Sequence, residues 1–516
     1  MANPGSRLRA GASALVRIFS AKPRAGTAAA QQLPALKQDV SASPQPEPLQ
    51  QEVGLYRRLS LLGCTDGEVA NAINEYTNEG KVIKKSELEK CIKDFHKFKR
   101  YSHVLEIGEW MAHKFILKHK DIAIHLDAVA KVKGIAAAEN YFNELRPSRR
   151  VKCTYAALLN CYCTEEMSDK AVDLFSKMVE QNMIDIPLPF NHLMMMYIRL
   201  GEPEKVIRLG EEMKKANVKP NTSTCSLLMS GYSLLNDFEG VERVLKEMTA
   251  ESKKLVNWTT YSHLANIYIK AGDQEKARLA LQGLEKEMRA HERDAYHFMI
   301  SLYAQMNDLD NVHRVWKSLK SASKVIWNTS YLIMIRSLDN LDDIEGLKEC
   351  FEEWEKVCSS YDVRLPNTVI RAYLRHGMLE EAESVLERTL ERSKGPFFYA
   401  WEMFMNFHLK RHGVKQAMKI METATSEAVN SKWKPSRDTI DGFLDCFKLD
   451  NDATGAEEFY ELMKRINCVD THFYESLLRI YAGAGQKLPD VRARVERDGV
   501  EISIELEDLI ASVSLE

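Results

Sequence analysis

Apolar residues recur along most of the chain with the spacing of one face of an α-helix. Tyr261, Leu264, Ala265 and Tyr268 stand at positions i, i+3, i+4 and i+7, which places their side chains on one side of a helix. A glycine, asparagine or aspartate follows such a stretch, and a second amphipathic stretch, such as 239–248, comes after it. Gly, Asn and Asp favour turns because they adopt left-handed or capping conformations. The pattern therefore predicts helical hairpins joined by tight turns.

The hairpins repeat with a period of 35 residues. In the block 187–221, Phe190 stands fourth, Gly201 fifteenth, Val206 twentieth and Met213 twenty-seventh. Along the chain the fourth-position residues are Tyr155, Phe190, Cys225, Tyr261, Tyr296, Tyr331, Pro366, Trp401, Ile440 and Tyr474. Six of the nine intervals between them are 35 residues. Chance does not hold such a register over this length, so the chain is a repeat array.

Two other positions keep the same register. The turn residues at the fifteenth position are Gly201, Asn236, Gly272, Asn307, Asp342 and Gly377, with Gly413 one place late. The twentieth position holds Ala171, Val206, Val241, Ala277, Val312, Leu347, Ala382, Ala417 and Ala456. These residues are small or branched, and we expect them to let the two helices of a hairpin approach closely.

One hairpin cannot bury its apolar faces alone, so neighbouring hairpins must stack. The sequence predicts an all-α fold, a right-handed superhelical solenoid of about 10–12 helix-turn-helix repeats of about 35 residues over 85–487. Two degenerate units, Lys85–Met111 and His119–Leu145, are expected at its start. Residues 51–84 are expected to form a helical N-terminal cap, and 488–516 an acidic C-terminal tail that is strand-like or frayed over 501–510.

The N-terminal segment differs in composition from the rest. Residues 1–38 contain six basic residues and no acidic residue before Asp39, and 7–19 can form a short basic amphipathic helix. This composition is typical of an organellar transit peptide, with a disordered basic tail as the alternative. Abundant arginine and sparse serine favour the mitochondrion, and hence its matrix, over the chloroplast. Residues 39–50 are proline-rich and are expected to be an extended linker.

Charge narrows the choice of ligand. The whole chain has 71 basic and 74 acidic residues, and without the six basic residues of 1–38 the balance is 65 against 74, or −9. Nucleic-acid affinity depends on phosphate neutralisation, so a chain of this charge has to contact RNA through a local patch. No run of 18 apolar residues that would indicate a membrane span is present.

The sequence contains no recognisable catalytic or metal-binding motif. The ten cysteines form no CxxC pair and no zinc spacing, which is typical of buried thiols in a reduced compartment. Phosphate-binding loops and nucleophile motifs are also missing from the sequence. We therefore expect no enzyme activity, no cofactor, no metal and no small-molecule substrate.

The repeat resembles a known family. Thr154-Tyr155 near the start, Gly272-Asp273-Gln274-Glu275-Lys276-Ala277 in the middle, and Met213 with Lys219-Pro220-Asn221 at the end carry the likeness. This pattern is similar to the pentatricopeptide repeat family, over about residues 85–487, and it resembles the pure-repeat class of land-plant mitochondria. The tetratricopeptide repeat differs, because its tryptophan-containing start is missing and its period is 34.

The resemblance implies single-stranded organellar RNA read by the fifth and last residues of each repeat on the concave helices. The candidate base-reading residues are Asn191, Asn221, Ser226, Asn257, Ser262 and Asn367. Asn191 with Asn221 suits a pyrimidine, and Ser226 with Asn257 suits adenine. Leu332, Glu402 and Asp441 depart from the family pattern at the same positions.

Two functions fit the sequence. The first is an RNA-binding protein in mitochondrial RNA metabolism or translation, without catalytic activity. The second is a protein–protein scaffold or a structural component of the mitochondrial ribosome, which the acidic balance and the unsuited reading positions favour.

Overall fold

The computed structural model describes residues 54–514 apart from 64–66, 252–255, 396 and 429–432. The transit peptide predicted for 1–38 and the linker predicted for 39–50 lie outside these residues. The described chain consists of helices joined by short loops and contains no β-strand, apart from an isolated bridge between Leu488 and Ser514. The all-α prediction is confirmed. None of the described helices is long and apolar enough to cross a membrane.

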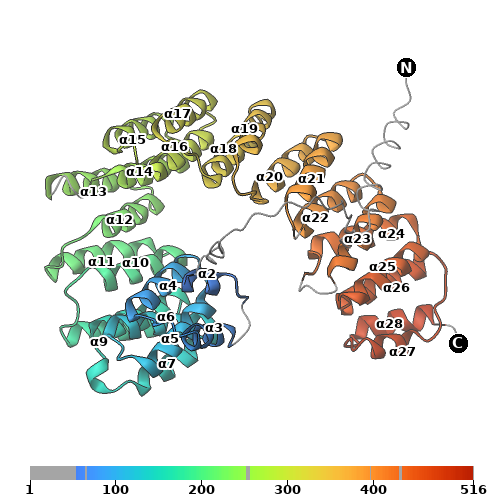
Figure 1. Ribbon diagram of the computed structural model, residues 1–516, viewed down its shortest axis with the longest axis horizontal. Helices are drawn as coiled ribbons and strands as arrows, with labels where there is room; N and C mark the ends of the chain where they lie inside the picture. Colours follow the sequence, from blue (N-terminus) through green and yellow to red (C-terminus); the bar gives the residue numbers. More distant parts are fainter. Residues whose placement is uncertain (1–53, 64–66, 252–255, 396, 429–432, 515–516) are drawn as a thin grey trace, which may run out of the picture. The chain divides into compact units, whose positions relative to one another are not determined.

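The described residues fall into two compact units, the first unit ending at Met288 and the second unit beginning at Arg289. Each unit is a series of helical hairpins (Figure 1). The first unit contains α2 (Leu55–Ser60), α3 (Glu68–Asn78), α4 (Lys85–Lys97), α5 (Tyr101–Lys114), α6 (His119–Lys133), α7 (Ile135–Glu144), the short 3-10 helix Pro147–Arg149, α8 (Lys152–Thr164), α9 (Ser168–Glu180), α10 (Leu188–Leu200), α11 (Pro203–Lys215), α12 (Thr222–Leu234), α13 (Phe238–Glu251), α14 (Trp258–Ala271) and α15 (Gln274–Glu287).

The second unit continues the same alternation. It contains α16 (Arg293–Gln305), α17 (Leu309–Ala322), α18 (Asn328–Asn340), α19 (Ile344–Val357), α20 (Arg364–Arg375), α21 (Leu379–Arg392), α22 (Phe398–Leu409), α23 (Val414–Ala428), α24 (Arg437–Asp450), α25 (Ala453–Arg465), α26 (Thr471–Gly483), α27 (Val491–Arg497) and α28 (Ile504–Val513). Within each unit, the first helix of a hairpin packs against the first helix of the next hairpin, as α8 does against α10 and α18 against α20. These helices form the first-helix row, which carries the fifth position of each repeat.

The turns follow the predicted register. Asn236, Asn307 and Asp342 have positive φ angles of 56°, 54° and 56°, the left-handed conformation that ends the first helix. The sequence had indicated Gly413 as the turn residue of its repeat, and the structure corrects this prediction. His412 takes the left-handed conformation, with φ of 54°, because the backbone keeps the fifteenth position even where the glycine is displaced.

The twentieth position packs as predicted. All nine of its residues are fully buried, with 0 % exposure. The twenty-seventh position is equally buried where it holds a larger side chain, as in Met178 and Trp354. Both positions lie on the second helix, seven residues apart, so they face the same side and pack into the interior of the array.

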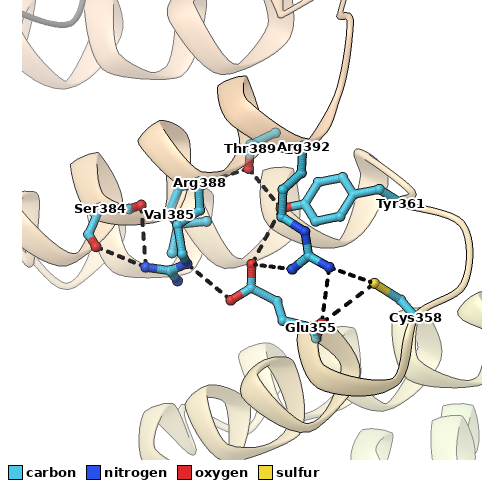
Figure 2. A network of polar contacts seen from close by, with 8 residues as sticks. All are labelled: Glu355, Cys358, Tyr361, Ser384, Val385, Arg388, Thr389 and Arg392. Atoms are coloured by element: carbon cyan, nitrogen blue, oxygen red, sulfur yellow. Dashed lines mark hydrogen bonds and ion pairs between the residues drawn. The ribbon is translucent and has the colours of Figure 1, made fainter. Parts of the chain in front are cut away.

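Polar contacts join the second helices of consecutive hairpins. Lys214 Nζ lies 2.9 Å from Glu247 Oε2, and Lys320 Nζ lies 3.0 Å from Glu353 Oε2, each across 33 residues. Figure 2 shows one of these contacts, in which Glu355 at the end of α19 binds the guanidinium groups of Arg388 and Arg392 on α21. Exposed pairs such as the two lysine–glutamate contacts contribute little each. The spacings of all these pairs, from 33 to 37 residues, lie close to the 35-residue period.

The C-terminal segment forms a helix where the sequence predicted a strand-like or frayed tail. Residues 501–510 were expected to be strand-like or frayed, because Ile502, Ile504 and Leu506 alternate with polar residues. The segment instead contains α28, which packs against α26. Leu506, Ile510 and Val513 are buried at helical spacing, and the Ser503 hydroxyl accepts a hydrogen bond from the Leu506 amide, which caps the helix.

Candidate nucleic-acid interface

The fifth and last positions of a repeat come together at the start of the first helices. A fifth residue such as Asn191 lies in the first turn of its helix, and the last residue of the same repeat, Asn221, is the N-cap of the next first helix. The first helices pack side by side, so the two residues become neighbours although 30 residues separate them. Helix N-termini also present a partial positive charge, which suits a polyanion.

Asn191 and Asn221 form one hydrogen-bonded cluster with Thr224. Asn191 Nδ2 donates to Asn221 Oδ1 at 3.4 Å, and Thr224 Oγ1 lies 2.8 Å from Asn191 Oδ1. The Thr224 amide donates to Asn221 Oδ1 at 2.9 Å. Asn191 is buried, with 5 % exposure, and Asn221 is exposed. Because the Asn221 oxygen is occupied, this pair can offer a base mainly the Asn221 amide N–H groups.

The other candidates of the first unit are held differently. Asn257 caps α14 by accepting hydrogen bonds from the Thr259 and Thr260 amides at 3.0 and 3.2 Å. Ser226 is half-buried, its carbonyl accepts a hydrogen bond from His263 Nε2 at 3.0 Å, and no hydrogen bond to Asn257 joins this pair among the residues described. Ser262 is buried, with 6 % exposure. Of these two predicted pairs, the structure therefore joins only Asn191 and Asn221 by a hydrogen bond among the described residues.

In the second unit the same positions bind residues of the chain itself. Glu402 Oε1 accepts hydrogen bonds from the Ser436 amide at 2.7 Å and from the Thr439 hydroxyl at 2.8 Å. Arg437 lies between Asp441 and Asp470, with nitrogen–oxygen distances of 3.3 and 2.6 Å. Burial raises the pKa of Asp470, but the Phe473 amide and Arg437 together hold that pKa below its ordinary value.

The remaining reading positions of the second unit contain few free polar groups. Leu332 is buried, with 5 % exposure, and Asn367 is half-buried. His297 Nε2 lies 2.8 Å from the Ser330 hydroxyl, and burial lowers the pKa of this histidine. His297 is therefore neutral at neutral pH and provides no cation for RNA.

A hydroxyl recurs at the third position of the repeats, where the sequence had indicated only the Thr154-Tyr155 pair. Thr224, Ser330 and Thr439 are buried, and each contacts the fifth-position side chain of the preceding repeat. Thr154 and Thr260 occupy the same third position. Their recurrence in the repeat register was a detectable signal. Thr224, Ser330 and Thr439 hold the fifth residue of the preceding repeat in one orientation, whereas Thr154 hydrogen-bonds to Val151.

Charge divides the first-helix row into two parts. Helices α8, α10, α12 and α14 of the first unit contain no aspartate or glutamate, and they carry Lys152, Arg199 and Lys270. Loop carboxylates pair with Lys152 and Arg199, whereas Lys270 has no ion pair among the described residues. This part of the row has a formal charge of +3.

The end of the second unit has the opposite charge. Helices α22, α24 and α26 contain six carboxylates against Arg437, Lys448 and Arg479, which gives −3. The acidic residues are Glu402, Asp438, Asp441, Asp445, Asp450 and Glu475. Between these parts, Arg371 of α20 donates to Asp339 at 2.7 Å. Helix α20 also carries three arginines and no carboxylate, and all three arginines pair with aspartates. The first part of the row is better suited to the phosphates of a nucleic acid than the acidic end is.

The described residues contain no group of three or more His, Cys, Asp or Glu side chains that could hold a metal ion. Cys161 and Cys163 of α8 are buried, and burial raises the pKa of both thiols to about 12. Such thiols are poor nucleophiles. The geometry of this row is suited to binding through hydrogen bonds and charge.

Comparison with known proteins agrees with the repeat register. The model described as the PPR repeat family matches residues 189–234, and the PPR repeat model matches 153–183, 223–252 and 366–393. The mitochondrial pentatricopeptide repeat-containing protein At1g02370 of Arabidopsis thaliana is 40 % identical over 463 residues, which cover 89 % of this chain and 86 % of that protein.

Two further similarities were found. The large ribosomal subunit protein mL101 (rPPR4) of Arabidopsis thaliana is 36 % identical over 467 residues, 90 % of this chain and 95 % of that protein. The crystal structure of the pentatricopeptide repeat protein PPR10 from maize aligns with 84 % of this chain and 66 % of that chain, at 16 % identity and a TM-score of 0.44.

Proposed function

This chain belongs to the pentatricopeptide repeat family, and from that premise we propose that it binds single-stranded RNA in the mitochondrial matrix. It acts in mitochondrial RNA metabolism or translation, and it does so as a binding protein without catalytic activity. The mitochondrial location is supported by the basic composition of 1–38 and by the relative At1g02370, whose name includes the mitochondrion.

The observation that carries the proposal is the carboxylate-free row of α8, α10, α12 and α14. A phosphate backbone approaching this row meets three basic side chains and the N-termini of four helices, and it meets no carboxylate on those helices. Phosphate neutralisation is the main source of affinity for nucleic acids. The rest of the chain is acidic, so the placement of these bases overcomes an unfavourable net charge.

The base-reading residues of this proposal are Asn191, Asn221, Ser226, Asn257, Ser262 and Asn367. Among them, the Asn191–Asn221 cluster has the clearest chemistry, because the Thr224 hydroxyl fixes the Asn191 amide. Amide N–H groups of Asn221 can donate to a pyrimidine carbonyl oxygen. Side chains at the row read unpaired bases, which are accessible only in single-stranded RNA.

Fluorescence anisotropy with labelled mitochondrial transcript fragments tests the proposal. The purified full-length chain should bind single-stranded fragments at micromolar concentration or below, and affinity should fall as salt rises. The same sequences annealed to their complements should bind more weakly, because their base edges are paired. Equal affinity for both forms, or no salt-sensitive binding, would contradict it.

A second function is supported by a separate observation. The relative mL101 is named as a large ribosomal subunit protein, and the acidic part of the row from α22 to α26 is unsuited to RNA. On this alternative the chain is a structural component of the mitochondrial ribosome. Sedimentation of the native protein in a mitochondrial extract tests it: co-migration with the large subunit supports the alternative, and migration as a free monomer contradicts it.

A further inference from the structure

An apolar groove lies in the first unit among α6, α8 and α10. Its floor is Ala156 and Ala157 of α8, and its walls include Ile124, Ile186 and Leu188. These three wall residues are 39 %, 51 % and 44 % exposed. The groove encloses about 620 Å³, which is enough for several side chains. Exposed aliphatic side chains that line one groove indicate an interaction surface.

The carboxylates that line the groove are already neutralised by the chain itself. Asp127 accepts hydrogen bonds from His96 Nε2 at 3.0 Å, from Lys131 Nζ at 2.9 Å and from Asn160 Nδ2 at 3.3 Å. Asp185 Oδ2 lies 2.8 Å from Lys152 Nζ. The inner end of the groove is therefore without an uncompensated negative charge.

One cation at the rim remains without a counter-ion. Lys120 is exposed, it lines the groove, and it forms no ion pair within the described chain. Burial lowers the pKa of His192 to about 4, so the imidazole at the α10 side of the groove is neutral at neutral pH. The lining as a whole has three lysines against two aspartates, a formal charge of +1.

We infer that this groove docks an amphipathic segment of a partner protein, with aliphatic side chains between Ile124, Ile186 and Leu188 and a carboxylate on Lys120. Amphipathic helices bind apolar grooves in this way, with their anchors spaced three or four residues apart. The inference goes beyond RNA binding, since the lining contains no phenylalanine, tyrosine or tryptophan on which a base could stack.

Selection from a phage-displayed library of random peptides on the immobilised full-length chain tests the inference. Enriched peptides should carry aliphatic residues at i, i+3 or i+4 and at least one aspartate or glutamate. The double variant Ile186→Ser, Leu188→Ser should bind them about tenfold to thirtyfold more weakly, because each substitution removes apolar area from the contact. Lys120→Glu should change the selected charge from acidic to basic.

Matched variants control for general effects. Leu279→Ser removes an aliphatic side chain of 60 % exposure from α15, and Lys177→Glu reverses an exposed charge on α9. Both should bind the selected peptides as the wild type does. Thermal unfolding followed by circular dichroism should be the same for the Ser variants as for the wild type, since the replaced side chains are exposed.

Three results would overturn the inference. One is that no peptide family is enriched, and another is that the double serine variant binds the enriched peptides with unchanged affinity. The third is that this variant loses tenfold in RNA affinity while peptide binding is unchanged, which would assign the groove to RNA. Failure of the whole chain to bind RNA would contradict the proposed function alone and leave the peptide result intact.

Discussion

The two units of the chain share one repeat register and differ in what they place on the first-helix row. In both units the twentieth position is fully buried, and the fifteenth position is left-handed. The row of α8 to α14 carries a formal charge of +3 without a carboxylate, whereas α22, α24 and α26 carry −3. The buried positions of a repeat specify the hairpin, so its exposed positions are free to diverge.

The reading positions show the same difference at the level of single contacts. Asn191 and Asn221 form an uncharged cluster that leaves amide donors at the surface. Glu402 and Asp441 occupy the equivalent fifth positions, and their carboxylates bind the chain's own Ser436 amide and Arg437. A carboxylate at such a site repels phosphate, so the proposed RNA contact is favoured at the first unit over the second.

The largest expected effect concerns the pH dependence of the second unit. Burial raises the pKa of Glu383 to about 7, and this side chain is only 6 % exposed. In the first unit, Glu139 and Glu242 occupy the equivalent twenty-first position, and hydrogen bonds from Lys170 and Lys276 lower their pKa values. The two units should therefore respond to pH in opposite directions at this position.

Proton uptake by Glu383 determines the direction in which the stability of the second unit changes with pH. Because the folded-state pKa of Glu383 exceeds its ordinary value of 4.5, the folded state binds more protons between pH 4.5 and 7, and stability falls as pH rises through this window. Glu383→Gln should stabilise the second unit at pH 8 by up to about 3 kcal/mol and should have no effect at pH 4. Thermal unfolding at the two pH values measures this, and an equal change at both would refute it.

The second-largest expected effect is a loss of RNA affinity when basic charges on the first-helix row are reversed. The double variant Arg199→Glu, Lys270→Glu should lower the affinity for single-stranded RNA about tenfold to hundredfold at low salt, and should reduce the slope of log affinity against log salt by about 1.4. Lys448→Glu on α24 is the matched control in the second unit and should lower the affinity by less than about fivefold. Equal losses in the two variants would remove the distinction between the units.

Removal of the fifth-position side chain should have the same effect on stability in both units but different effects on RNA affinity. Asn191→Ala leaves the buried Thr224 hydroxyl without one of its partners, and it should lower the unfolding free energy by about 1–2 kcal/mol as well as RNA affinity. Glu402→Ala breaks the corresponding contact with Thr439 and should lower stability by a similar amount without weakening RNA binding. Chemical denaturation and anisotropy on both variants test the contrast.

The smallest expected effect is a gain. The double variant Glu402→Gln, Asp441→Asn removes two carboxylates from the acidic part of the row and retains hydrogen-bonding groups at both positions. RNA affinity should rise by about twofold to fivefold at low salt, because fewer negative charges oppose the phosphates. The gain should disappear above about 0.3 M salt as exposed charges are screened, and a decrease in affinity would show that the acidic residues themselves take part in binding.

Much of the fold could be predicted from the sequence because the repeat multiplies each weak signal. The hairpins, their turns and the small buried residue at the twentieth position were all visible in the register. The expectation of a strand-like tail at 501–510 was wrong, because a short segment with both alternating and helical apolar spacing takes the form its neighbours allow. Here Leu506, Ile510 and Val513 are buried where α28 packs against α26.

The sequence by itself determined the period, the core and the positions that line the first-helix row, because each of these depends on local helical spacing repeated many times. The tertiary structure decided which side chains of that row are free. Thr224 reaches Asn191 across 33 residues, Arg437 lies between Asp441 and Asp470, and the walls of the apolar groove come from α6, α10 and the loop before α10. Such contacts join residues that only the packing of successive hairpins brings together, and no local pattern encodes them.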